Sequence, residues 1–218
     1  MNACREKSCE WSEYKLIAII DYGVGNLKSV EKAFHFIDCD AKVSCDRDFI
    51  LNADAVVLPG VGAFADAIKS LEKSGMYEVV KKVIEDNKPF LGICLGMQLL
   101  FDYSEEGGQN VKGLGVFKGA IRQLPENMNL KVPHMGWNSL EIRGQSPLFK
   151  DLGGNPFVYF VHSYYLDTDD SDIVIARTNY GLNFAVAVQR GNIFATQFHP
   201  EKSGEVGLAI LKNFAGMF

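Results

Sequence analysis

The sequence lacks any apolar run long enough to cross a lipid bilayer. The stretch from Leu16 to Ile20 is among the longest, whereas a membrane-spanning helix needs about 20 predominantly apolar residues. Residues 1–14 also lack the apolar segment of an export signal, because they are polar and of mixed charge. We therefore expect a protein that does not bind membranes and that works in the cytoplasm.

Basic residues are few relative to acidic ones. The 22 Lys and Arg residues are outnumbered by 27 Asp and Glu residues, which gives a formal net charge of -5. Because a nucleic-acid-binding surface needs concentrated positive charge to neutralise phosphates, we expect no nucleic-acid partner. Disordered chains are poor in apolar residues, and a hydrophobic fraction of 47% excludes that class here.

The spacings that indicate a disulfide framework or a metal site are also missing. The five cysteines are odd in number and include no CxxC pair, and the four histidines show no HxxxH or HExxH spacing. We therefore expect no structural disulfide, no metal ion and no cofactor. The cysteines are Cys4, Cys9, Cys39, Cys45 and Cys94.

In the first half of the chain, short apolar runs alternate with segments of helical spacing. This alternation predicts βαβ units around a largely parallel sheet. The expected strands are 16–20, 53–58 and 90–93, and the expected helices are 27–37, 63–71, 76–86 and 95–103.

The second half consists mainly of strand-like runs separated by Gly, Asn and Asp. The expected elements are strands at 116–124, 140–142, 158–166, 173–178, 184–189 and 193–198, a hairpin turn at 190–192 and a closing helix at 204–214. We infer one α/β domain over residues 15–218, with a doubly wound, largely parallel central sheet and added antiparallel strands. Residues 1–14 are expected to form an N-terminal extension, to which the sequence assigns no role.

Cys94 differs from the other cysteines in its setting. It lies between Gly92 and Gly96 in a G-x-C-x-G segment, where a predicted strand meets a predicted helix. This is the thiol counterpart of a nucleophile elbow, in which glycines relieve crowding around a strained turn. The N–H groups at the start of the helix would favour a thiolate, and the N–H of Leu95 could donate to an oxyanion.

A base and its orienting group are expected at His199 and Glu201. Both follow a predicted strand, and residues two apart on an extended segment project to the same side. Pro200 stiffens their connection, so Glu201 can fix the tautomer of His199 and leave the other ring nitrogen for Cys94. The three residues match the logic of a nucleophile, base and orienter.

Plainer interpretations of these residues remain open. Cys94 could be a buried cysteine between packing glycines, and His199 could end a strand with Glu201 in solvent. Among the other histidines, His35 is expected on a helix face and His134 in a loop.

Two of these segments, Pro89–Gln98 and His199–Glu201, resemble the motifs of class I (triad-type) glutamine amidotransferases. Three more segments resemble, within that family, the glutaminase subunits of imidazole glycerol phosphate synthases, which act in histidine biosynthesis. These are Asp21–Leu27, Val132–Asn138 and Ala195–Ser203. The resemblance covers the chain from about Leu16 to its C-terminus and implies a class I amidotransferase-like fold.

The resemblance also implies the chemistry. Cys94 would attack the side-chain carboxamide of glutamine, His199 would pass the thiol proton to the leaving ammonia, and the glutamyl thioester would be hydrolysed. Backbone N–H groups of Leu95 and Val61 would hold the oxyanion. In this family the loop that contains Val61 is thought to need a peptide flip, which the flanking Gly60 and Gly62 would permit. Otherwise the loop is an ordinary βα turn.

Further positions match the glutamine ligands of the family. Glu106 would pair with the substrate ammonium group, although its carboxylate could instead be a solvated loop charge. His162, Ser163 and Tyr164 would supply backbone contacts, although His162 could equally serve packing. The implied substrate-binding residues are Gly60, Gln98, Glu106, His162, Ser163 and Tyr164.

A partner is implied because ammonia in neutral water is mostly non-nucleophilic ammonium, so that a shielded route is needed. In the family the acceptor is a separate (β/α)8-barrel cyclase subunit, which forms a heterodimer with the glutaminase and makes imidazole glycerol phosphate and an aminoimidazole carboxamide ribonucleotide. The implied interface residues are Asn26, Trp137, Tyr159 and Lys202. Trp137 suits an interface hot spot, with core packing as the alternative. Low glutaminase activity is expected without the cyclase.

Other functions remain compatible with the sequence. A paralogous glutaminase could feed a different acceptor synthase, such as a sugar-modification enzyme, because the triad does not identify the acceptor. A stand-alone cysteine hydrolase would act without a partner. A non-catalytic relative would be expected to have lost part of the triad, and here Cys94, His199 and Glu201 are all present.

Overall fold

The computed structural model describes residues 15–108, 110–125 and 130–218. The N-terminal extension expected at residues 1–14 lies outside this part, and the domain boundary at residue 15 stays a prediction. No helix in the described ranges combines the length and the apolar character that crossing a membrane requires.

Among the described residues, parallel strands form one side of a twelve-stranded sheet, from the edge strand β2 inward in the order β2-β1-β3-β4-β14. Their bounds are β1 (Leu16–Ile20), β2 (Asp40–Ser44), β3 (Ala55–Gly60), β4 (Phe90–Cys94) and β14 (Ile193–Thr196). In β1, Ile17 and Ile19 pack into the core on one face, while Ala18 and Ile20 pack into the core on the other. Burial on both faces explains why this strand is a continuous apolar run.

Beyond β14 the sheet continues mainly through antiparallel strands, in the order β13-β11-β7-β5-β6, with β12 and β9 attached beside β13. Their bounds are β5 (Tyr103–Ser104), β6 (Val111–Lys112), β7 (Ala120–Gln123), β9 (Glu141–Ile142), β11 (Tyr164–Asp167), β12 (Val174–Asn179) and β13 (Asn183–Arg190). Arg190 pairs with Ile193, which confirms the predicted hairpin. A separate two-stranded sheet joins β8 (His134–Ser139) to β10 (Phe157–His162).

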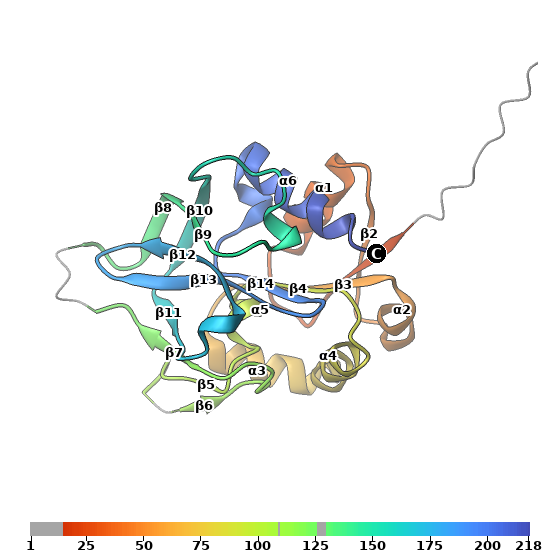
Figure 1. Cartoon of the computed structure of the whole chain (residues 1–218). Helices are drawn as coiled ribbons and strands as arrows, with labels where there is room; N and C mark the ends of the chain where they lie inside the picture. Colours follow the sequence, from red (N-terminus) through yellow and green to blue (C-terminus); the bar gives the residue numbers. More distant parts are fainter. Residues whose placement is uncertain (1–14, 109, 126–129) are drawn as a thin grey trace, which may run out of the picture.

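Helices cover both faces of the central sheet, with α1 and α6 on one side and α3 and α4 on the other (Figure 1). In α3 the buried residues Phe64, Ala67, Ile68 and Leu71 recur at helical spacing and face the core. The helices are α1 (Leu27–Phe36), α2 (Arg47–Asn52), α3 (Phe64–Lys73), α4 (Met76–Glu85), α5 (Leu95–Gln98) and α6 (Gly204–Ala215). The doubly wound α/β fold is therefore confirmed.

The helix predicted over 95–103 is wrong in length, because α5 ends at Gln98. The backbone N–H groups of Leu114 and Val116 donate to the carbonyls of Leu99 and Leu100 at 2.8 Å each. Those carbonyls are then not available to continue a helix, and the chain turns into β5 instead.

Other boundaries also differ from the prediction. The predicted strand 116–124 begins only at Ala120, and the predicted strand 158–166 is divided between β10 and β11 at Ser163. The segment with β2 and α2 was not predicted. His134, expected in a loop, begins strand β8, where it pairs with His162 of β10.

Strands β3 and β4 and helix α5 meet at Gly96, which allows α5 to pack against β3. A Cβ atom added to Gly96 would lie 1.9 Å from the carbonyl oxygen of Leu58, and one added to Gly92 would lie 2.9 Å from the carbonyl oxygen of Gly96. Only glycine permits backbones to approach this closely. The expected role of the two glycines around Cys94 is therefore matched by the packing.

We expect Gly96→Ala to lower the free energy of unfolding by at least about 2 kcal/mol, since the added methyl group forces a backbone shift. Urea denaturation followed by circular dichroism measures this change. Gly153→Ala is the matched control, because nothing lies within 4 Å of its added Cβ, and it should change stability by less than about 0.5 kcal/mol. Equal stability of the two variants would contradict the packing argument.

Candidate active site

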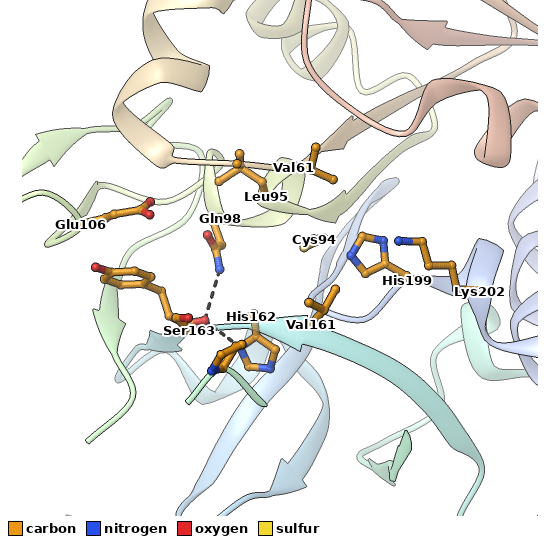
Figure 2. A pocket seen from close by; sticks show the side chains of 13 residues that line it. Val61, Cys94, Leu95, Gln98, Glu106, Val161, His162, Ser163, His199 and Lys202 are labelled. Atoms are coloured by element: carbon orange, nitrogen blue, oxygen red, sulfur yellow. Dashed lines mark hydrogen bonds between the residues drawn. The ribbon is translucent and has the colours of Figure 1, made fainter. Parts of the chain in front are cut away.

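A pocket of about 440 Å³ opens where β3, β4 and β14 end. Figure 2 shows Cys94 and His199 toward one end of this pocket and Glu106 toward the other, with Gln98 between them. Of the predicted site residues, those that line the pocket are Val61, Cys94, Leu95, Gln98, Glu106, His162, Ser163, Tyr164, His199 and Lys202. The structure therefore brings together groups that are about a hundred residues apart in the sequence.

Cys94 occupies the sharp turn between β4 and α5. Its backbone has φ of 55° and ψ of -110°, a left-handed conformation that is strained for a residue with a side chain. The residue is 7% exposed and its sulfur lies at the pocket wall. This is the geometry of a nucleophile elbow, in which the turn aims the side chain outward from the sheet.

His199 and Glu201 are in contact, as predicted. His199 Nδ1 and Glu201 Oε1 are 2.8 Å apart, and the two side chains are only 2% and 1% exposed. The contact arises differently from the prediction, since Glu201 lies in a 3-10 turn, Pro200–Lys202, rather than on an extended segment. Within the described part of the chain, His199 Nε2 is buried and makes no hydrogen bond, so that this nitrogen is free for proton transfer.

The protonation of His199 is set by opposing effects. Burial lowers the pKa of the ring, but its interactions with Cys94 and Glu201 outweigh burial and raise the pKa from 6.5 to about 9. The raised pKa favours the protonated form of the ring. A protonated imidazole beside a sulfur atom is the state expected after the thiol has transferred its proton.

Two backbone groups were predicted to hold an oxyanion. Leu95 is the first residue of α5 and Val61 lies in the loop after β3, where its side chain is 40% exposed. Gly62 beside it has φ of 94°. The helix that was expected to favour a thiolate has only four residues, so its dipole is weaker than a full helix would supply. Gly60 does not line the pocket and packs instead against Tyr22 and Leu95.

Gln98 and Glu106, two predicted glutamine ligands, are both anchored by the protein. Gln98 Nε2 donates to the carbonyl of Tyr164 at 3.2 Å and to Gln197 Oε1 at 2.8 Å. Glu106 Oε2 accepts from the backbone N–H of Phe64 at 2.6 Å, so Glu106 stabilises the start of α3. Its carboxylate remains at the pocket wall, where an ammonium group could reach it.

His162 contributes more than a backbone contact. Its Nδ1 lies 2.8 Å from the carbonyl oxygen of Tyr164, and its Nε2 lies 3.0 Å from His134 Nδ1. Burial lowers the pKa of His134 to about 4 and that of His162 to about 3. Both rings are therefore neutral at physiological pH, and the hydrogen bonds set their tautomers.

Gln197 is a site residue that the sequence analysis missed. Its Nε2 donates to Cys94 Sγ at 3.7 Å, and the residue is 1% exposed. The one available signal was its place two residues before His199, directly after a strand that borders the strand of Cys94. Side-chain amides at such positions are common, so this signal alone indicates no role.

Of the four predicted interface residues, Lys202 alone lines the pocket. Trp137 is 56% exposed, which argues against core packing, and its ring meets that of Tyr159 edge-on at 6.2 Å. Lys202 lines the pocket next to His199 (Figure 2). Asn26 immediately precedes α1. In residues 15–108, 110–125 and 130–218, no three His, Cys, Asp or Glu side chains gather as a metal site would require.

Comparison with known protein families identifies the family to which this chain belongs. The sequence model of the family described as "Glutamine amidotransferase class-I" matches residues 18–217. The chain belongs to the class I glutamine amidotransferases. Nearly the whole described chain is included in this match, so the pocket and its cysteine elbow are features of an amidotransferase domain.

The curated relatives narrow the family of this amidotransferase. The imidazole glycerol phosphate synthase subunit HisH of Caldanaerobacter subterraneus subsp. tengcongensis is 53% identical, over 93% of this chain and 98% of that protein. HisH of Geobacter metallireducens is 52% identical, over 91% and 97% of the two chains. At this identity and coverage, the amidotransferase is a member of the HisH family.

Solved structures support the fold of the amidotransferase. The structure of PurLQS from Thermotoga maritima has a TM-score of 0.73 at 18% identity and covers 93% of this chain and 98% of that chain. A crystal structure titled only "glutamine amidotransferase" has a TM-score of 0.71 at 20% identity and covers 92% and 99%. At these identities the likeness concerns the fold alone.

We expect Glu201→Gln to lower the pKa of His199 from about 9 toward 6.5, because the carboxylate is one of the groups that raise it. The ring would then lose its proton as the pH rises through a lower range. A titration of the ring proton signals by NMR measures this. Glu205→Gln, at an exposed position in α6, is the control. A midpoint that is the same in both variants would exclude the proposed contribution of Glu201.

Proposed function

We propose that the chain is the glutaminase subunit of an imidazole glycerol phosphate synthase. It hydrolyses glutamine to glutamate and ammonia and passes the ammonia to a separate cyclase subunit in histidine biosynthesis. One observation carries this proposal: a strained cysteine and a histidine that contacts a buried glutamate line one pocket, in a chain about half identical to HisH subunits. As an enzyme of small-molecule biosynthesis, it is proposed to act in the cytoplasm.

The proposed reaction begins with the carboxamide of glutamine beside Cys94. A lone pair of Sγ forms the bond to the carboxamide carbon, and the carbonyl electrons move onto oxygen. Protonated His199 gives its proton to the amide nitrogen, and the C–N bond then breaks to release ammonia and leave a thioester. A raised His199 pKa suits this step, because the ring must hold a proton to give.

Hydrolysis of the thioester uses the same ring in the opposite sense. Neutral His199 takes a proton from water as the water oxygen attacks the thioester carbon. The second tetrahedral intermediate collapses, the C–S bond breaks, and the sulfur leaves as a thiolate beside the imidazolium. Glu201 holds the ring in place throughout through its 2.8 Å contact with Nδ1. The initial charge state is thereby restored.

Binding and oxyanion roles are proposed for the remaining residues of the pocket. Glu106 pairs with the ammonium group of glutamine at the end of the pocket away from Cys94 (Figure 2). The N–H of Leu95 supplies one oxyanion donor and that of Val61 the second, after a peptide flip. Because one donor would be missing before that flip, activity is expected to be low until the cyclase is bound.

A (β/α)8-barrel cyclase is the proposed partner, and Trp137 is proposed as the centre of its docking surface. Trp137 and Met135 are 56% and 62% exposed on the same strand, β8. Exposed aromatic and methionine side chains are enriched at protein interfaces. Strand β10, paired with β8, ends at His162 in the pocket wall, so that a partner on this sheet would be close to the site of ammonia release.

The two curated relatives reported above are both HisH subunits of imidazole glycerol phosphate synthase, and neither favours a different acceptor. A stand-alone hydrolase would show high glutaminase activity without any cyclase. The experiments below distinguish that function from the proposed one.

We expect Cys94→Ala, assayed together with the cyclase subunit, to abolish glutamine-dependent synthesis and to leave ammonium-dependent synthesis intact. The cyclase needs only ammonia, whereas glutamine hydrolysis needs the sulfur. The measurement is the rate of product formation with glutamine or with an ammonium salt as nitrogen donor. Cys45→Ala, at an exposed cysteine, should keep both rates. Survival of the glutamine-dependent rate in Cys94→Ala would rule out this nucleophile.

We expect Trp137→Ala to weaken binding of the cyclase by about 2 kcal/mol, roughly thirtyfold, if Trp137 is a hot spot. Isothermal titration calorimetry measures the affinity. Phe36→Ala is the matched control, since Phe36 is 76% exposed at the C-terminal end of α1, the helix that leads into the edge strand β2 and not into the sheet of Trp137. A loss of affinity in the control but not in Trp137→Ala would place the interface elsewhere.

A further inference from the structure

We propose that the side-chain amide of Gln197 is a dedicated hydrogen-bond donor that holds the Cys94 sulfur as a thiolate and aims it into the pocket, with Gln98 fixing the direction of that donor. This inference rests on the proposed function, because it concerns the same nucleophile. It adds a residue outside the His–Glu pair to the groups that prepare the sulfur for attack.

The orientation of both amides follows from a backbone carbonyl. The carbonyl oxygen of Tyr164 can only accept, so the side-chain group of Gln98 that lies 3.2 Å away must be its NH₂ group. The same nitrogen lies 2.8 Å from the side chain of Gln197, which must therefore present its oxygen. Gln197 then has its NH₂ group turned to Cys94 Sγ, at 3.7 Å. The donor to sulfur is thus determined by the network.

The position of the Tyr164 carbonyl is fixed by a second hydrogen bond, from His162. His162 Nδ1 donates to it at 2.8 Å, so His162 Nε2 must accept, and it does so from His134 Nδ1 at 3.0 Å. His134 Nε2 in turn lies 3.3 Å from the amide nitrogen of Asn138, its donor. The rings of His134 and His162 therefore each have one defined tautomer in this hydrogen-bonded network. The acceptor on which Gln98 depends is therefore fixed by side chains on β8 and β10.

Burial makes this donor effective. Gln197 is 1% exposed and Gln98 is 5% exposed, so that water cannot readily replace either amide. A neutral thiol is a weak acceptor, whereas a thiolate is a charged one, and hydrogen bonds to charged groups are the stronger kind. A buried N–H aimed at the sulfur therefore favours the thiolate. It does what was expected of the helix α5, which has only four residues.

The same donor would also assist the second half of the reaction. In the thioester the sulfur carries no charge and accepts hydrogen bonds poorly. When the C–S bond breaks, negative charge returns to the sulfur, and the Gln197 N–H is already in place to stabilise it. Gln197 touches the reacting atom and would contribute to kcat, while glutamine itself is bound by other groups.

The test uses the full chain and two substitutions at position 197. Gln197→Met removes the donor and keeps an unbranched side chain of similar size. Gln197→Glu keeps an oxygen that can accept from Gln98 but turns a carboxylate oxygen toward the sulfur. The control is Gln189→Met, because the amide of Gln189 is hydrogen-bonded to Ser146 and Gly191 and not to the site residues.

The first readout is the rate of alkylation of Cys94 by iodoacetamide as a function of pH, followed by mass spectrometry of the peptide that contains Cys94. We expect the midpoint of this profile to rise by about one pH unit in Gln197→Met, as loss of one hydrogen bond to a charged group implies. The rise should be larger in Gln197→Glu and absent in Gln189→Met. Identical profiles in all variants and the parent would overturn the inference.

The second readout is glutamine turnover with the cyclase bound. We expect kcat to fall about tenfold in Gln197→Met, for the same loss of a charged hydrogen bond, with KM for glutamine nearly unchanged. A change in KM alone, with the alkylation profile unaltered, would refute a role at the sulfur. If the parent protein turned over no glutamine, the proposed function would fail, and the alkylation profiles would still decide the role of Gln197.

A further variant covers the case in which substitutions at position 197 do not fold. Gln98→Met leaves Gln197 in place but removes the group that orients it, so the alkylation midpoint should rise in the same direction. Alkylation does not depend on glutamine binding, so the substrate-binding role that the family resemblance implies for Gln98 does not affect this readout. A Gln98→Met profile equal to that of the parent would count against the inference.

Discussion

The close approach of α5 to β3 is the constraint on which the whole site depends. Gly96 lies so near the carbonyl of Leu58 that no side chain fits there. This contact holds the short turn after β4 and keeps Cys94 in a left-handed backbone conformation that it would otherwise leave. The strain is local, but the packing that sustains it is spread through the parallel part of the sheet. The nucleophile is therefore positioned by the core of the protein rather than by a flexible loop.

The site also depends on the exclusion of water from one side of the Cys94 sulfur. His199, Glu201 and Gln197 are almost completely buried there, and hydrogen bonds between buried polar groups are stronger than those in water. The raised pKa of His199 results from this arrangement, because its interactions with Cys94 and Glu201 exceed the cost of burying the charged ring. The opposite side of the sulfur faces the pocket, where glutamine is proposed to bind. Glu201 and Gln197 lie outside the lining of the pocket, whereas Cys94 and His199 belong to it.

Much of the fold and part of the candidate site could be predicted from the sequence, for identifiable reasons. The parallel strands β1, β3, β4 and β14 were recognisable because they are short apolar runs buried on both faces, whereas the partly exposed edge strand β2 was not predicted. Cys94 was recognisable because two glycines surround it. The end of α5 could not be predicted, since it depends on N–H groups donated by residues 114 and 116. Gln197 was missed because its role depends on a partner 99 positions earlier in the chain, Gln98. The tautomers of His134 and His162 likewise follow only from the pairing of β8 with β10.

The central claim is that Cys94 carries a covalent glutamyl group during the reaction. Rapid acid quench of the chain with its cyclase and glutamine, followed by peptide mass spectrometry, tests it most directly. The account predicts the mass of one glutamyl group on the peptide that contains Cys94, its loss when the quenched sample is treated with hydroxylamine, and its absence in Cys94→Ala. Glutamine hydrolysis at full rate with no such adduct, or with the adduct on another cysteine, would contradict the account.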